Sequence, residues 1–320
     1  MTRPAPPPRR VTVLSGGIGG VKLVEGLAEL VPAGHLSVIC NTGDDLDWWG
    51  LHVSPDVDTV MYTLAGLADR DRGWGLEGET WQALELMRRY GEPDWFQLGD
   101  RDLATHLIRT RLMAGGASLT DVTARLAERL QIQAQVIPMS DDPVRTMVVT
   151  TEGTLEFQDY FVRRRFEPPV EEVRFEGADA ARPSPGAVAA LQEADVVVVA
   201  PSNPVASIGP ILAVRGVRLA LEQARAVRVA VSPLIGGEAV KGPTVPMMQA
   251  AGLPVDPLGV ARAYEGLVDA MVIDRVDHAY EAQLRMNGLK VLVTDTLMEG
   301  FEGRLRLAAE VLDFAAACAR

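Results

Sequence analysis

Residues 10–31 read RVTVLSGGIGGVKLVEGLAELV. An apolar run rich in β-branched residues leads into a glycine-rich loop, and apolar residues at helical spacing follow it. A second apolar run, LSVIC at residues 36–40, ends in the loop NTGDD at residues 41–45. This order of strand, loop, helix, strand and loop predicts an α/β fold, a Rossmann-like, doubly wound and mostly parallel sheet. Ligands of such sheets bind beyond the carboxyl ends of the strands, where both loops are expected to lie.

The rest of the chain extends this pattern. Residues 56–130 show helical spacing without an intervening strand, which predicts a helical insertion. Residues 146–164 are interpreted as a hairpin around Glu152 and Gly153. Further strand and helix patterns continue from residue 186 to a last helix at 302–318. We therefore expect a flexible leader at residues 1–9 and a single α/β domain at residues 10–320, with its helical insertion at about 56–130.

Composition excludes several classes of protein. The chain has 320 residues and a net charge of −12, which argues against binding to nucleic acid. No apolar run reaches the length of a membrane span, and the basic, proline-rich start lacks the apolar centre of a signal peptide. Two cysteines, Cys40 and Cys318, suggest neither a disulfide framework nor a zinc site. A cytoplasmic protein that binds no membrane is expected.

The first glycine loop, residues 15–20, is interpreted as a phosphate-binding loop. Glycines permit close backbone approach to an anion, and the following helix offers free N–H groups. The Lys-Ser/Thr ending of a P-loop is absent. A dinucleotide fingerprint is also disfavoured, because Lys22 replaces its third glycine and Asn41 replaces the acidic residue after the second strand. The ligand-contact candidates are Gly16, Gly17, Gly19 and Gly20; the alternative is a tight turn for strand–helix packing.

Carboxylates in the second loop suggest a divalent cation. Asp44 and Asp45 are adjacent at the expected end of a strand, and such a pair is costly unless it is solvated or neutralised. Asp58 can reach the same crevice if residues 51–55 fold back. Oxygen ligands without a His/Cys set favour Mg²⁺ over zinc. The alternative for Asp56 and Asp58 is that either one caps the next helix.

Two later loops offer polar groups at expected strand ends. Residues 200–204, APSNP, offer the side chains of Ser202 and Asn203, and Pro204 can open a helix. The alternative for this loop is a simple helix cap. Residues 232–237, SPLIGG, are followed closely by Lys241. Ser232, Gly236 and Lys241 are therefore candidates for contact with a nucleotide base or phosphate.

Arginine and aromatic clusters leave more than one interpretation open. Arg163, Arg164 and Arg165 follow an expected aromatic strand, so Arg163 and Arg165 would face one way. They suit either a carboxylate or diphosphate, or a solvated face. All five tryptophans lie within residues 48–95 and form either a wall for a planar ring or ordinary packing. His106, on an amphipathic helix, is either packed or catalytic.

Six segments together resemble the 2-phospho-L-lactate transferase family. They are VTVLSGGIGGVKL, NTGDDLDWWGLHVSPDVDTVMYTLAG, PDWFQLGDRDLATHLIRT, FQDYFVRRR, APSNPVASIGPIL and VSPLIGGEAVKGP, in this order from about residue 11 to 243. The resemblance implies a Mg²⁺-dependent phosphotransferase of coenzyme F-420 biosynthesis. Such enzymes take a phospholactyl or phosphoenolpyruvyl group from a GDP-linked donor, pass it to the ribityl hydroxyl of the deazaflavin Fo and release GMP. A homodimer is expected.

The resemblance also implies roles for individual residues. Asp44 and Asp45 are expected to be catalytic and to bind the metal with Asp58. The SGGIGG, APSNP and SPLIGG loops are expected to surround the substrates, with further contacts from Asn41, Trp95, Asp100, His106 and Arg163. The nearest alternative is the sister family of gluconeogenesis factors, which bind UDP-sugars and are regulatory. The segment PDWFQLGDRDLATHL argues against that alternative.

Overall fold

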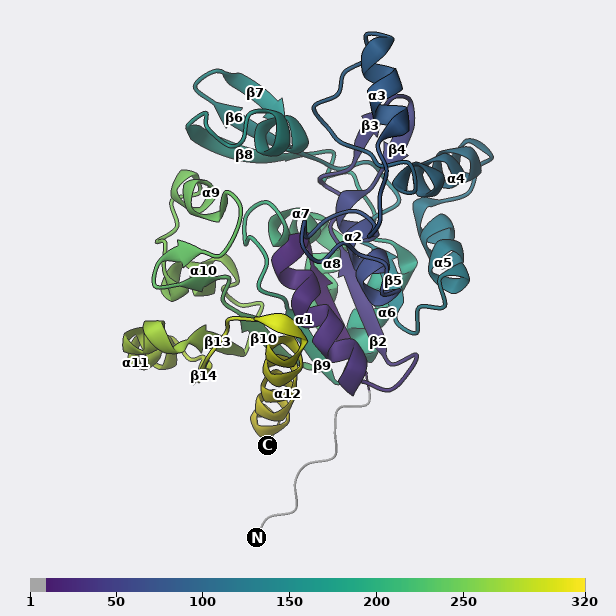
Figure 1. The fold of residues 1–320 in the computed structure, drawn as a ribbon. Coiled ribbons are helices and arrows are strands. Elements are labelled where there is room, and N and C mark those ends of the chain that lie inside the picture. The colour runs from purple at the N-terminus through teal and green to yellow at the C-terminus, as the bar shows by residue number, and fades with distance from the viewer. Residues whose placement is uncertain (1–9, 320) are drawn as a thin grey trace.

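The structure is a computed structural model that describes residues 10–319. The expected leader at residues 1–9 lies outside the described residues. Seven parallel strands form the central sheet, in the order β14-β13-β10-β9-β1-β2-β5 (Figure 1). They are β1 (Val11–Ser15), β2 (Leu36–Cys40), β5 (Gln135–Pro138), β9 (Val196–Val199), β10 (Val227–Val231), β13 (Ala270–Asp274) and β14 (Lys290–Thr294). The predicted doubly wound, parallel fold is confirmed.

The order of strands locates the crevice of the fold. The chain adds β2 and β5 on one side of β1, and then β9, β10, β13 and β14 on the other. β1 pairs with β2 from Val11↔Leu36 to Ser15↔Cys40, and with β9 from Val11↔Val196 to Leu14↔Val199. The strand order therefore reverses between β1 and β9. A ligand crevice is expected beyond the carboxyl ends of these two strands.

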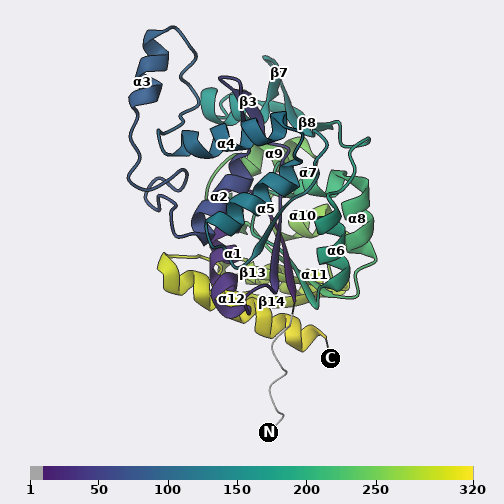
Figure 2. The ribbon, with the colours of Figure 1, turned by 90° about the vertical axis from the view of Figure 1, so that its right-hand side faces the viewer.

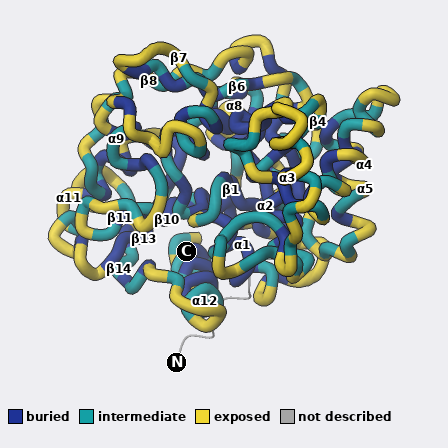
Figure 3. The backbone as a smooth tube through the Cα atoms, turned by 45° about the horizontal axis from the view of Figure 1, so that its top comes forward, coloured by how far each residue is buried: buried dark blue, intermediate teal, exposed yellow. Residues whose placement is uncertain are grey.

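Alternate residues of the strands build two apolar cores, one on each face of the sheet. Val13 and Val198 belong to the core under α1 (Gly17–Leu30), α2 (Pro55–Leu64) and α12 (Gly300–Cys318). Leu14 and Val199 belong to the core under α6 (Pro185–Glu193), α7 (Ile208–Ala213), α8 (Arg215–Glu222) and α10 (Pro257–Ala263). Figure 3 shows β1 and α2 buried and the exposed backbone at the periphery. Both faces of the strands are covered, which explains their continuous apolar runs.

The expected helices are present between β2 and β5. They are α2, α3 (Gln82–Arg89), α4 (Asp102–Ala114) and α5 (Leu119–Arg129), and no strand of the central sheet interrupts them. A short hairpin of β3 (Leu46–Trp48) and β4 (Leu51–Val53), which was not expected, precedes α2. In the turned view α3 stands away from the sheet, at the end of long loops (Figure 2). None of the helices in residues 10–319 has the length and apolarity needed to cross a membrane.

A second, antiparallel sheet lies beside the crevice, and the segment that follows its hairpin differs from the sequence prediction. The predicted hairpin is formed by β6 (Arg145–Thr150) and β7 (Gly153–Glu156), and β8 (Val170–Glu176) pairs with the other side of β6. The expected aromatic strand after it is wrong. The chain becomes helical and includes the π-helix η1 (Asp159–Arg163), whose i→i+5 bond joins Arg164 N to Asp159 O at 2.9 Å. Phe157 and Phe161 are spaced for a helix as well as for a strand, so local pattern does not separate the two.

The remaining elements border the crevice or the far edge of the sheet. They are β11 (Leu234–Ile235), β12 (Glu238–Ala239), α9 (Thr244–Ala250), the 3₁₀ helix η2 (Arg275–Tyr280) and α11 (Glu281–Met286).

Candidate active site

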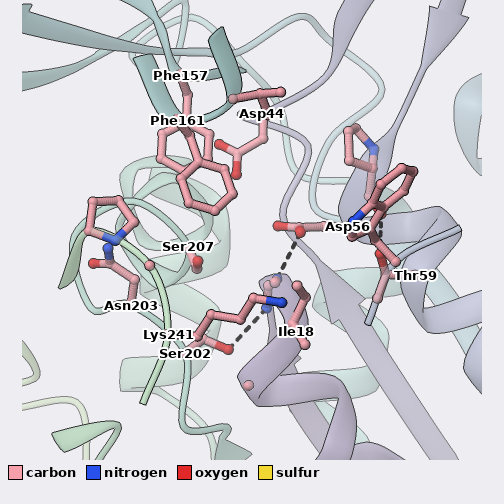
Figure 4. Close-up of a pocket in the computed structure, with 18 of the residues that line it drawn as sticks. Ile18, Asp44, Asp56, Thr59, Phe157, Phe161, Ser202, Asn203, Ser207 and Lys241 are labelled. Carbon is pink, nitrogen blue, oxygen red and sulfur yellow. Dashed lines mark hydrogen bonds between the residues drawn. The ribbon is translucent and has the colours of Figure 1, made fainter. Parts of the chain in front are cut away.

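A cavity of about 1090 Å³ lies beyond the carboxyl ends of the strands. Its walls combine the start of α1, the loops after β2, β9 and β10, the start of α2, and residues 95–98 and 157–166. Figure 4 shows side chains from these distant segments pointing into one space. A cavity of this size is at the upper end of those that hold small molecules, so two substrates can occupy it together.

The first glycine loop borders the cavity at the start of α1. Gly16, Gly17 and Gly19 line the cavity, and Gly17 has a left-handed φ of 65°. A Cβ atom on Gly19 would lie 2.6 Å from the carbonyl oxygen of Pro201, so this glycine is also required for packing. Gly20 does not line the cavity and packs against the hydroxyls of Ser15 and Ser202. Gly16, Gly17 and Gly19 therefore stay candidates for ligand contact, while Gly19 and Gly20 have a role in packing.

Asp56 occupies the N-terminus of α1 instead of capping its own helix. Its Oδ1 accepts a hydrogen bond from Gly17 N at 2.7 Å, and its Oδ2 accepts one from Asn41 Nδ2 at 3.0 Å. Burial raises the pKa of Asp56 to about 6, although the bonds from Asn41 and Gly17 oppose that rise. Asn41 itself does not line the cavity; it also accepts from Gly43 N at 2.7 Å and so holds the loop in place. Sequence reasoning left Asp56 open between a cap and a metal ligand.

Asp44 presents its carboxylate to the same space (Figure 4). Its Oδ1 is buried and has no hydrogen-bond partner among residues 10–319. Burial, with the nearby charge of Asp56, raises the pKa of Asp44 well above its ordinary value. A buried carboxylate oxygen without a donor calls for a cation or a polar ligand group.

The three carboxylates expected to share a metal are not brought together. Asp45 does not line the cavity; its Oδ1 accepts from Ser54 Oγ at 2.7 Å, and its Oδ2 lies 3.1 Å from His52 Nε2. Asp58 does line it, but both of its carboxylate oxygens bind the guanidinium of Arg109, with Nη1 at 2.9 Å from Oδ2. Within the described chain, no group of three or more His, Cys, Asp or Glu residues has a metal-holding arrangement.

A buried polar network backs this wall of the cavity. Tyr62 Oη donates to Asp102 Oδ1 at 2.6 Å, and His106 Nε2 lies 3.2 Å from the same oxygen. His106 Nδ1 lies 3.2 Å from Arg109 Nη1, so the network continues to Asp58. His106 is therefore packed within a network and also lines the cavity. Tyr62, Arg109 and Asp102 were not identified from sequence, because their partners lie on other helices.

The two later loops bring some of the expected residues to the cavity. Ser202, Asn203, Ser232 and Lys241 line the cavity, whereas Pro204 and Gly236 do not. Asn203 Oδ1 accepts from the backbone N–H groups of Val205 and Ala206 at 2.9 and 3.1 Å, as in the cap interpretation of this loop. Gly236 N donates to the carboxylate of Asp277.

Some of the tryptophans line the cavity, and others pack against neighbouring side chains. Trp74 and Trp95 line the cavity, while Trp48 is buried in a cluster with Trp95 and Phe96. Trp74 and Trp81 flank the guanidinium of Arg72, at 5.2 and 5.1 Å from their ring centroids. Trp74 and Trp95 therefore stay candidates for the wall of a ligand site, and Trp48 is part of the packing.

Asp100 and Arg163 lie outside the cavity lining. Asp100 accepts from Thr80 Oγ1 at 2.6 Å and from the N–H groups of Gln82 and Ala83 at the start of α3. The bond from Thr80 lowers the pKa of Asp100. Arg163 faces Asp159 at 3.5 Å, and Arg165 is the arginine of the run that lines the cavity. Lys22, which sequence reasoning treated only as a departure from a fingerprint, also lines it.

Fold and site thus define a Rossmann-like α/β protein with one large cavity at the point where the strand order reverses. The chain belongs to the 2-phospho-L-lactate transferase family, since the family described as "2-phospho-L-lactate transferase CofD" matches residues 11–307. It is a transferase, as the resemblance of its motifs indicated.

Relatives along the whole chain agree with this assignment. The 2-phospho-L-lactate transferase of Methanosarcina mazei is 41% identical over 300 residues, which cover 94% of this chain and 98% of the relative. The phosphoenolpyruvate transferase of Streptomyces coelicolor is 41% identical over 312 residues, which cover 96% and 98%. A crystal structure of a UPF0052 family protein from Bacillus halodurans has 14% identity and a TM-score of 0.63, covering 95% of this chain and 99% of that one. The last likeness shows the fold alone.

Proposed function

We propose that this transferase moves a phosphorylated three-carbon acid, phospholactyl or phosphoenolpyruvyl, from a GDP-linked donor to the ribityl hydroxyl of the deazaflavin Fo, with release of GMP. The observation that carries the proposal is a cavity of about 1090 Å³ that brings together the start of α1, two carboxylates and aromatic walls. The two relatives differ in the acid that their names specify, and the chain is 41% identical to both. The acid is therefore left open between the two.

The donor's diphosphate is assigned to the start of α1. Helix N-termini favour anions through free N–H groups and the helix dipole. Gly17 N already donates to Asp56, so the diphosphate would use the N–H groups that follow it in the first turn of α1. Lys22 and Lys241 line this part of the cavity, and neither makes an ion pair within residues 10–319. Burial, with the charges of Arg304 and Lys241, lowers the pKa of Lys22, so a bound anion would relieve the repulsion between these cations.

Asp44 and Asp56 fit a Mg²⁺ ion better than Asp44, Asp45 and Asp58, the set expected from sequence. Mg²⁺ is commonly held by one or two carboxylates together with water and substrate phosphates. Asp44 offers a buried oxygen without a donor, and the carboxylate of Asp56 points into the same space (Figure 4). A bound Mg²⁺ would neutralise charge on the diphosphate and orient it.

The chain's own groups would align the reaction. The ribityl oxygen forms a bond to the phosphorus that carries the acid, and the bond from that phosphorus to the bridging oxygen breaks. GMP leaves with the electron pair, and the hydroxyl proton passes to a cavity carboxylate. The lysines and the N–H groups of α1 would stabilise the charge that develops on the phosphate oxygens. Trp74 and Trp95 offer flat apolar surface for the deazaflavin ring.

The direct test supplies purified protein with Mg²⁺, Fo and either guanylylated phospholactate or guanylylated phosphoenolpyruvate. The expected products are GMP and the phosphoacid ester of Fo, detected by mass spectrometry. The reaction should stop with excess chelator and resume when Mg²⁺ is restored. Absence of GMP above the no-enzyme control with both donors would overturn the proposal. The cytoplasmic location and the homodimer expected from sequence stay predictions.

A further inference from the structure

We propose that Arg165 binds the carboxylate of the donor's three-carbon acid, an inference that rests on the function proposed above. Arg165 lies in the turn that follows the helical residues 157–163, which replace the expected aromatic strand. The recognition site would thus lie on a different element from the lysines assigned to the diphosphate.

One face of this segment is turned toward the cavity. Its i→i+5 bonding brings residues four or five apart onto the same side. Phe157, Gln158, Phe161 and Val162 follow that spacing and line the cavity, and Arg165 and Phe166 of the turn that follows line it as well. Tyr160 lies between them in sequence and is fully buried, and Arg163 and Arg164 lie outside the lining. The helix and the turn after it therefore bring one arginine of the three to the cavity.

The three arginines also differ in their ion pairs. Arg163 lies 3.5 Å from Asp159, and Arg164 lies 3.6 Å from both Glu152 and Asp159. Arg165 is exposed at the cavity wall and has no acidic partner within residues 10–319. Arg163 and Arg164 are satisfied as an outer charged face, whereas Arg165 retains its whole hydrogen-bonding capacity for a ligand.

The backbone holds Arg165 in this place. Arg165 and Phe166 have left-handed φ values of 51° and 48°, which are uncommon outside glycine. Phe166 N donates to Tyr160 O at 2.9 Å, and the ring of Phe166 stacks on Phe161 at 6.0 Å between centroids. Backbone strain of this kind persists where the surroundings over-determine it, and it concentrates at functional sites. The turn thus places a guanidinium and an apolar ring together at the edge of the cavity.

The donor's anionic groups match the cations that line the cavity. Its diphosphate is assigned to Lys22 and Lys241, and its remaining anion is a carboxylate. Arg109 is already neutralised by Asp58. Arg165 is the remaining arginine or lysine of the described lining. A planar guanidinium matches a carboxylate with two parallel hydrogen bonds, which a lysine cannot supply.

The test compares two ligands that differ in the carboxylate. Guanylylated phospholactate and the ethyl ester of GDP share the diphosphate, and the ester replaces the lactyl group by ethyl. Binding is measured by calorimetry with Mg²⁺ and without Fo, so no transfer occurs. Arg165→Ala should weaken binding of the lactyl ligand on the order of 10- to 100-fold, the usual scale for a charge-assisted bond, and leave the ethyl ester within about threefold. Arg165→Lys should retain part of the affinity.

Arg163→Ala is the matched control and should leave both affinities within about threefold of the parent. Equal losses for the two ligands in Arg165→Ala, or no loss for either, would overturn the role of Arg165. The transfer assay described above is run on the same wild-type preparation. A wild-type protein that binds the lactyl ligand through Arg165 but yields no GMP would contradict the proposed function and leave the carboxylate site standing.

Discussion

At the scale of single residues, neighbours in sequence have different roles in the site. Asp44 faces the cavity with a buried oxygen that lacks a donor, whereas Asp45 is held by Ser54 and His52 behind it. The segment resemblance placed both residues in the metal site, with Asp58. The contacts favour Asp44 and Asp56 for that role, because their carboxylates share the space where the diphosphate is assigned.

Asp44→Asn tests this assignment directly. The change removes a charge at nearly constant size, and it relieves a carboxylate whose pKa is raised by burial, so folding should survive. Transfer should fall by roughly 100-fold or more, the scale expected when metal-assisted charge stabilisation is lost. The measurements are the rate of GMP release and the melting temperature. Asp45→Asn is the control and should lower the rate of transfer less than about tenfold. A folded Asp44→Asn variant that is as active as its parent, or equal losses of activity in both variants, would contradict the assignment.

At the scale of elements, buried polar contacts join α2 to α4. The Asp58–Arg109 pair and the Tyr62–Asp102 bond connect helices across 51 and 40 residues of sequence. Arg109 is fully buried, and although burial opposes it, the carboxylate of Asp58 raises the pKa of Arg109. This wall carries His106 and Asp102 to the cavity, so the site depends on the packing of the two helices.

Arg109→Met should destabilise the protein by about 3–5 kcal/mol, because it leaves the Asp58 carboxylate buried without a partner. Adding Asp58→Asn removes that charge and should recover a large part of the loss. Denaturant unfolding of the parent, the two single variants and the double variant gives the coupling between the residues. Strictly additive effects would show that the ion pair does not hold α2 against α4.

At the scale of the whole molecule, this chain shares its fold with a protein of very different sequence. The Bacillus halodurans protein shares the fold at 14% identity, so the fold alone does not identify the ligand. The groups available to recognise a ligand come from the loops and helices around the crevice: Lys22 and Lys241, Trp95, and the lining residues of 157–166.

A ligand that binds only the native state raises the melting temperature, which separates the proposed function from the UDP-sugar alternative. GDP with Mg²⁺, at about 100 times its dissociation constant, should raise the melting temperature on the order of 5 °C. UDP-glucose at the same concentration should leave it unchanged. The reverse result, stabilisation by UDP-glucose and none by GDP, would favour a regulatory nucleotide-sugar protein.

The sequence by itself determined the parallel sheet and the location of its ligand loops. Strands β1, β2, β9 and β10 are mostly apolar, and each is followed by a polar or glycine-bearing loop. The spacing of apolar residues and the composition of loops are local properties, so they can be recognised in the sequence without the fold. The family-specific segments were likewise readable as strings of residues, and the match over residues 11–307 confirms them.

Only the tertiary structure decided which side chains reach the cavity. Asp56 meets Gly17 across 39 residues, and Asp58 meets Arg109 across 51, so neither partner is visible in a local window. The spacing of the aromatic residues after β7 fits either a strand or a helix. The chain forms a helix there, and Tyr160 of that helix is buried in an apolar cluster. That choice turns Arg165 inward and Arg163 outward. The physical reason is that burial and long-range pairing act on the folded chain, and they outweigh the small local preferences that a sequence displays.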